Sequence, residues 1–153
     1  MTSDEIQSKW REGRSPVLNG ILRASGRSTA LQIHIGDPYD ASTYRLEIVE
    51  ANSPDNLNTV DEAFISEMYE VCDYVRDQKA GCGETSLEAE GFVALSRAKS
   101  GDLIWLAIFE NVGAFRECRL LRDRVAALSE YDVWWYFPID SPENLAVRST
   151  LDA

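Results

Sequence analysis

The sequence has few of the side chains on which enzyme active sites are commonly built. It contains one histidine and three cysteines in 153 residues. A histidine-based triad therefore has a single available base, His34, which alternates with Ile33 and Ile35 and is expected on the opposite face of a strand from them. The chain also lacks a phosphate-binding loop, a dinucleotide fingerprint and a His-Glu-x-x-His motif. We therefore expect no catalysis. A hydrolase stays a third alternative, and it would need a deep pocket with His34 and two carboxylates.

The cysteines do not follow a metal-binding pattern. Cys72 and Cys82 are separated by nine residues, which matches no common zinc spacing. An odd number of cysteines without a secretory signal indicates free thiols, so we expect no metal and no cofactor. Cys82 lies between Gly81 and Gly83 in an acidic segment, which disfavours a reactive thiolate and favours a helix-terminating glycine turn.

Long apolar runs are also missing. The longest is Leu103–Phe109, which is far shorter than the roughly 20 residues that span a bilayer. Because it is apolar at every position, it predicts a central strand that is covered on both faces. The first five residues, Met-Thr-Ser-Asp-Glu, have neither a basic nor an apolar segment. We therefore expect a cytoplasmic protein without a signal peptide or a membrane partner.

Negative charge is abundant and unevenly placed. The formal net charge is −11, and residues 37–92 hold fourteen acidic and three basic side chains. This charge repels phosphate backbones and attracts basic surfaces, so it argues against nucleic acid and for a basic protein partner. Plain solubility is an equally good explanation of the composition.

The strongest helix pattern covers residues 59–79. Thr59 and Glu62 have the spacing of a capping box, and apolar residues recur at helical intervals behind them. The acidic residues would then form a solvent-facing stripe that continues into the following loop. Its members are Glu62, Glu67, Glu70, Asp73, Asp77, Glu84, Glu88 and Glu90.

The other elements alternate between short helices and strands. Shorter helices are predicted over residues 2–13, with Ser3 as the cap, and over 16–24. Residues 115–128 fit either a helix or a hairpin, and the imperfect helical wheel favours the hairpin. Strands are predicted over 29–36, 44–50, 92–98, 103–109 and 131–139, with a turn and a short final strand over 140–147. The expected fold is a single α+β domain over residues 1–153, in which the N-terminal helices and the long helix pack on an antiparallel sheet of about five to seven strands.

The aromatic run at Trp134–Phe137 belongs to the last long strand. Val133, Trp135 and Phe137 would face one side, and Trp134 and Tyr136 the other. One set must be core. The second set is either covered by the N-terminal helices or exposed as an anchor for a protein interface.

The stretch Trp135–Glu143, together with the small size, the acidity and the lack of a catalytic signature, resembles immunity proteins that neutralise bacterial toxins. This resemblance implies a non-catalytic inhibitor that covers a basic, nuclease-type surface with carboxylates. The alternative is a structural or adaptor subunit that forms a homodimer or joins a larger complex through the face of Trp134 and Tyr136. The expected partner-binding residues are the eight acidic residues above with Trp134 and Tyr136.

Overall fold

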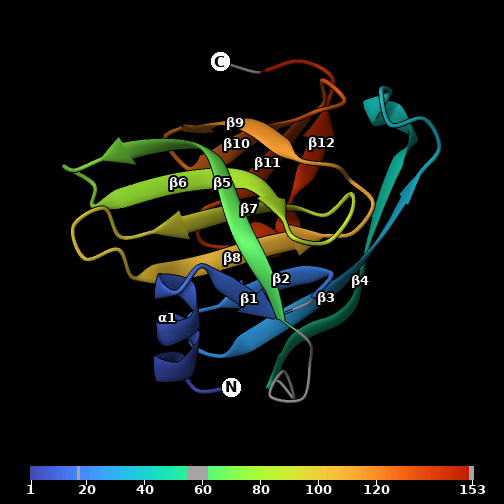
Figure 1. Cartoon of the computed structure of the whole chain (residues 1–153). Coiled ribbons are helices and arrows are strands. Elements are labelled where there is room, and N and C mark those ends of the chain that lie inside the picture. The colour runs from blue at the N-terminus through green and yellow to red at the C-terminus, as the bar shows by residue number, and fades with distance from the viewer. Residues whose placement is uncertain (17, 55–61, 152–153) are drawn as a thin grey trace.

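The chain folds mainly into antiparallel strands, which form two sheets (Figure 1). The structure is a computed structural model and describes residues 1–16, 18–54 and 62–151. Within these ranges there are twelve strands and a single α-helix. In chain order, the elements of the N-terminal half are α1 (Ser3–Arg11), β1 (Arg14–Pro16), β2 (Gly20–Arg23), β3 (Arg27–Ile35), the 3₁₀ turn η1 (Ala41–Thr43), β4 (Tyr44–Pro54) and β5 (Glu62–Asp73). They are followed by β6 (Gln78–Thr85), β7 (Gly91–Ser96), β8 (Leu103–Phe109), β9 (Phe115–Leu120), β10 (Arg124–Ser129), β11 (Trp134–Pro138), η3 (Pro142–Asn144) and β12 (Ala146–Arg148).

The larger sheet has eight strands in the order β1-β5-β6-β7-β8-β2-β3-β4, and the smaller has four in the order β12-β11-β10-β9. The predicted α+β fold with five to seven strands and a long packed helix is therefore wrong. Two stacked sheets bury apolar faces against each other, so this fold does not need a long helix to cover its core.

The main core lies between the two sheets and is built from aromatic rings. Trp105 and Phe109 of β8 face Trp135 and Phe137 of β11, and all four side chains are buried. The rings of Phe109 and Trp135 stack with their centres 5.2 Å apart. Phe115 meets Trp135 edge-on at 5.5 Å. Such pairs add stability beyond the area that they bury, so this cluster fixes how the sheets face each other.

Strand β8 confirms the prediction for Leu103–Phe109. It lies between β7 and β2 inside the larger sheet, and six of its seven side chains are buried. Its second face carries Leu106 and Ile108, which pack with Ile6 of α1. The helix therefore covers the side of the sheet that the smaller sheet does not.

Helix α1 confirms the prediction for residues 2–13, although its cap is Thr2 rather than Ser3. The Thr2 Oγ1 accepts a hydrogen bond from the Glu5 amide at 3.2 Å. No helix within the described ranges is long and apolar enough to cross a bilayer.

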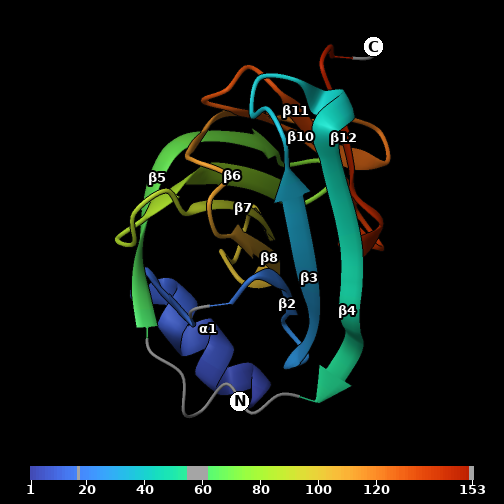
Figure 2. The same cartoon turned by 90° about the vertical axis from the view of Figure 1, so that its right-hand side faces the viewer.

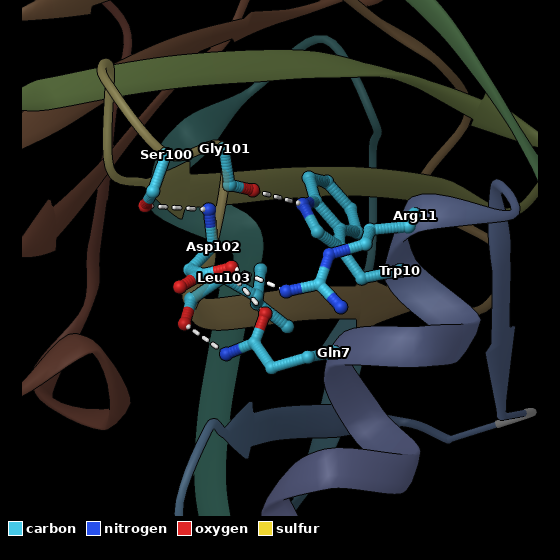
Figure 3. Close-up of polar contacts among 7 residues, drawn as sticks. All are labelled: Gln7, Trp10, Arg11, Ser100, Gly101, Asp102 and Leu103. Atoms are coloured by element: carbon cyan, nitrogen blue, oxygen red, sulfur yellow. Dashed lines mark hydrogen bonds and ion pairs between the residues drawn. The ribbon is translucent and has the colours of Figure 1, made fainter.

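Polar side chains of α1 attach the helix to the turn before β8 (Figure 3). The Gln7 amide donates to the Leu103 carbonyl at 3.0 Å and accepts from the Leu103 amide at 2.8 Å. The Trp10 indole donates to the Gly101 carbonyl at 3.1 Å, and Arg11 pairs with Asp102 at 2.8 Å. The Gln7 side chain thus pairs with both backbone groups of Leu103, the first residue of β8, as a neighbouring strand would.

The predicted helix over residues 16–24 is wrong. Gly20–Arg23 forms β2, which lies between β8 and β3. Ile21 and Leu22 are buried on opposite faces, Ile21 in the inter-sheet core and Leu22 beneath α1. A short apolar run of this kind fits a buried strand as well as a helix. Here it forms a strand because β8 and β3 each pair with one of its edges.

The predicted long helix over residues 59–79 is also wrong. Glu62–Asp73 is β5, which turns back at residues 74–77 into β6. A β-bulge between Glu67 and Tyr69 adds one residue to β5 and shifts the side-chain alternation. That shift breaks the period of two and imitates helical spacing. The capping residue Thr59 lies outside the described residues.

The remaining strand predictions are confirmed. β3 and β4 cover the predicted strands over 29–36 and 44–50 and pair as an antiparallel hairpin, in which Ile35 lies opposite Tyr44. Residues 115–128 form the hairpin of β9 and β10 rather than a helix. β7, β11 and the short final strand β12 lie where they were expected.

Candidate protein-binding surface

Strand β5 has a largely open edge. One side pairs with β6, and the other pairs with the three-residue β1 at Glu62–Phe64 only. Ile65 then donates to the Gly13 carbonyl at 2.8 Å. Among the described residues, no strand pairs with the outer edge of β5 after that point. Figure 2 shows β5 and β4 at opposite margins of the curved larger sheet.

Large apolar side chains are exposed along β5 and the turn that follows it. Their exposed fractions are 62% for Phe64, 52% for Met68, 44% for Tyr69, 63% for Tyr74 and 96% for Val75. Aromatic residues and methionine are enriched in the cores of protein interfaces. We call these five residues the β5 surface. An open strand edge beside exposed rings is the arrangement that protein partners use when they add to a sheet.

Two carboxylates share one ammonium group next to this surface. Lys79 Nζ lies 2.6 Å from Glu70 and 3.5 Å from Glu67. Burial and a hydrogen bond with Glu70 raise the pKa of Glu67, whereas the hydrogen bonds of Glu70 with Glu67 and Lys79 lower the pKa of Glu70. When both carboxyl groups are ionised, Lys79 leaves one negative charge of this group uncompensated.

Two glycines of β6 make room for Glu67 and for the bulge of β5. A Cβ atom at Gly81 would lie 2.8 Å from the Glu67 Oε2, so the missing side chain makes room for this carboxylate. A Cβ atom at Gly83 would lie 2.1 Å from the Ser66 carbonyl oxygen and 2.9 Å from the Met68 amide nitrogen. Gly83 therefore permits the bulge that turns Met68 outwards. The predicted helix-ending glycine turn at 81–83 is wrong, because these glycines lie within a strand.

The other predicted acidic residues do not form one stripe with Glu67 and Glu70. Glu62 pairs with Lys9 and with Arg14 at the end of β1. Asp73 accepts hydrogen bonds from the amides of the β5–β6 turn, and Asp77 accepts from the Lys99 amide at 2.9 Å. Glu84 is exposed on β6 opposite Ser66 of β5, and Glu88 is exposed in the loop after β6. Asp73 pairs with Gln78 at the start of β6, so Asp73 and Glu84 lie about 20 Å apart along the strand.

Glu90 is buried and faces inwards. It is 2% exposed, its Oε1 accepts a hydrogen bond from Thr85 at 2.9 Å, and its Oε2 has no hydrogen-bond partner among the described residues. Burial raises the pKa of this carboxyl, the Thr85 hydroxyl lowers it, and the nearby charge of Glu110 raises it. Glu90 is thus unable to contact a partner on the surface.

The structure also buries Trp134 and Tyr136, which are 9% and 3% exposed. Leu121, Leu128 and Leu151 pack against them. The guanidinium groups of Arg119 and Arg124 lie over the two rings at 5.7 and 4.5 Å. Arg119 and Arg124 of the β9–β10 hairpin, together with Leu151 near the C-terminus, therefore cover this face, instead of the N-terminal helices.

A hollow of about 800 Å³ lies beside the β3–β4 hairpin and the end of β8. His34 and Arg45, which are opposite each other on the paired strands, line it with Glu110 and Asn111. Both His34 and Arg45 are exposed. The hollow has one carboxylate in its lining rather than the two that a hydrolase site with His34 would use. The described residues contain no group of three or more metal-binding side chains.

The β5 surface was missed in the sequence because Phe64, Met68 and Val75 were assigned to the buried side of a helix. The adjacent apolar pair at 64–65 carries the signal, since neighbours in a strand point to opposite faces. No protein-family model, curated protein or solved structure matches the chain.

Proposed function

We propose that the chain is a non-catalytic protein-binding domain and that its partner docks on the β5 surface. The observation that carries this proposal is the exposure of Phe64, Met68 and Tyr69 on β5, whose outer edge is open beyond β1, together with Tyr74 and Val75 in the turn that follows. Exposed apolar side chains scattered singly are ordinary, whereas three on an open strand and two more in the turn after it, all within residues 64–75, form an aggregation hazard unless something covers them.

The charges beside the β5 surface favour a basic partner. Glu67 and Glu70 share Lys79, and Glu84 is an exposed carboxylate with no ion pair among the described residues. The whole chain has a net charge of −11, so a cationic partner is attracted over a long range and a nucleic acid is repelled. Carboxylates would speed association, and the apolar side chains would slow dissociation.

The finer proposal is an immunity-type inhibitor that acts in the cytoplasm and neutralises a bacterial toxin with a basic active site. The charge and the β5 surface support it. Because most of the acidic residues have internal partners, the apolar residues of β5 supply the binding energy in this version, and the carboxylates set the orientation. The face of Trp134 and Tyr136 loses its support as a docking site because both rings are buried.

Site-specific photocrosslinking tests the proposal in cells of the source organism. A photoreactive phenylalanine analogue replaces Tyr74, which is 63% exposed on the β5 surface, or Tyr39, which is 64% exposed in the β3–β4 loop. The proposal expects one basic protein crosslinked through position 74 and none through position 39. A crosslink only to a second copy of the chain would indicate self-association. Equal crosslinking at both positions, or none at either, would contradict a specific surface.

Binding measurements with the crosslinked protein separate the roles of charge and apolar contact. Met68→Asp should abolish binding. The double reversal Glu70→Lys with Glu84→Lys should weaken binding and reduce its dependence on salt concentration. Asp73 is a poorer choice for reversal, because it holds the amides of the β5–β6 turn. An unchanged affinity and an unchanged salt slope would refute the electrostatic part.

A further inference from the structure

Two of the three cysteines meet between the sheets. Cys82 of β6 and Cys118 of β9 are both buried in the main core, whereas Cys72 of β5 is partly exposed. Ala80 and Cys82 are two residues apart on β6, so both side chains point into this core. β6 and β9 therefore present one thiol each to the space between the sheets.

Hydrogen-bond distances place the Cys118 sulfur directly over the β5–β6 pair. Its Sγ lies 3.5 Å from the carbonyl oxygen of Ala80 and 3.9 Å from that of Tyr69. Tyr69 is the residue that pairs with Cys82 across the two strands. The Cys118 thiol therefore lies beside Cys82, and the hydrogen bond between the two thiols, burial and the Cys82 charge all raise the pKa of Cys118.

We infer that Cys82 and Cys118 form a disulfide that joins the two sheets when the chain folds in the presence of an oxidised thiol. β6 and β9 pack closely, with Cα atoms of the two strands within 8 Å of each other, and the two thiols lie side by side between them. The bond would require Cα atoms of Cys82 and Cys118 about 4.4–6.8 Å apart. Both thiols are free in this structure, which corresponds to the reduced form.

The reaction is thiol–disulfide exchange with oxidised glutathione as the electron acceptor. One cysteine thiolate attacks a glutathione sulfur, which forms a mixed disulfide and releases one glutathione thiolate. The second cysteine thiolate then attacks the protein sulfur of the mixed disulfide and releases the other glutathione. Two thiol hydrogens leave the protein, and two molecules of reduced glutathione form. Because burial disfavours the thiolate in the folded chain, the exchange occurs during folding, before the sheets close.

The experiment uses the full chain with Cys72→Ser, which removes the partly exposed thiol. This variant is refolded from denaturant in oxidised and reduced glutathione, or in reductant alone. After refolding with glutathione, the mass should fall by two hydrogen atoms, neither cysteine should react with an alkylating reagent in denaturant, and a proteolytic map should show the Cys82–Cys118 crosslinked peptide. The oxidised form should also melt about 10 °C above the reduced form, because the crosslink restricts the unfolded chain.

Full alkylation of both cysteines after refolding with glutathione, or glutathione adducts without the crosslinked peptide, would overturn the inference. A disulfide that lowers the melting temperature would also overturn it, because the bond would then distort the native sheets. The double variant Cys72→Ser with Cys118→Ser serves as the control and should show no mass loss. If that control does not fold, the crosslinked peptide of the single variant still decides the matter.

Discussion

Strands β8 and β5 belong to the same sheet and are both rich in apolar residues, yet they have opposite environments. β8 has a neighbour on each side, the smaller sheet on one face and α1 on the other, and six of its seven side chains are buried. β5 lies near the margin, and of its twelve side chains only Ala63 is buried. The comparison shows that apolar content alone does not assign a residue to the core. The number of covered faces and paired edges decides which apolar residues are buried in the core and which remain exposed.

The most severe test replaces one phenylalanine in each strand. Phe109→Ala in β8 removes a ring that stacks on Trp135, and it should lower the free energy of unfolding by about 4 kcal/mol. Phe64→Ala in β5 removes a ring that is mostly exposed, and it should change stability by less than about 1 kcal/mol. Urea denaturation measures both. Equal losses would mean that the β5 surface is part of the core.

A glycine pair in β6 sharpens the comparison at the bulge of β5. Gly83→Ala places a Cβ atom against the backbone of Ser66 and Met68, so it should destabilise the fold by about 3 kcal/mol. Gly81→Ala is the matched control. Its Cβ meets only the carboxylate of Glu67, which can move, so the change should stay within about 0.5 kcal/mol. A tolerated Gly83→Ala would show that the bulge relaxes easily.

The attachment of α1 to β8 provides the next test. Gln7→Leu removes both hydrogen bonds to Leu103 and leaves its amide and carbonyl without these partners. The expected loss is about 2 kcal/mol. Gln32→Leu is the control, because Gln32 is exposed on β3. If the two variants unfold at the same denaturant concentration, the covering of β8 by α1 does not depend on Gln7.

The smallest expected effect concerns Glu90, which bonds to Thr85 at the end of β6 next to β5. Its pKa is raised above 4.5 in the folded chain, so its protonated form is favoured there. The wild-type protein thus loses stability as pH rises from about 4.5 through the raised pKa. Glu90→Gln stays neutral and should be about 1 kcal/mol more stable at pH 8.

Denaturation at several pH values checks this prediction. The advantage of Glu90→Gln should shrink towards zero as the pH falls well below 4.5, where the wild-type carboxyl is protonated in both states. A variant that is less stable than the wild type at pH 8 would contradict the prediction and would mean that the charged carboxylate has a favourable role.

Local patterns predicted those parts of the fold that have one possible environment. The uniform apolar run of Leu103–Phe109 fits only a covered strand, and the acidic first turn of α1 with its nearby cap predicts a short helix. Local patterns also predicted strands at β3 and β4, and the imperfect helical wheel of residues 115–128 predicted the hairpin of β9 and β10. The prediction of a long helix over residues 59–79 was wrong because the bulge at Met68 removed the alternation that would have identified β5 as a strand.

The candidate site was less predictable than the fold. The sequence identified the acidic segment, but the stripe it predicted depended on the helix that is not there. Glu62 instead meets Lys9 and Arg14, residues about fifty positions earlier in the chain. Trp134 and Tyr136 could be assigned to one face from alternation, but their burial depends on Arg119 and Arg124 of neighbouring strands.

The amino-acid sequence by itself determined the charge of the molecule, the scarcity of catalytic side chains and the strands whose apolar residues leave them no exposed face. The tertiary structure decided which strand lies at the margin, which carboxylates meet a cation and which two thiols lie side by side. The physical reason is that side-chain type and spacing act within a few residues, whereas burial and pairing depend on contacts between segments that are far apart in the chain.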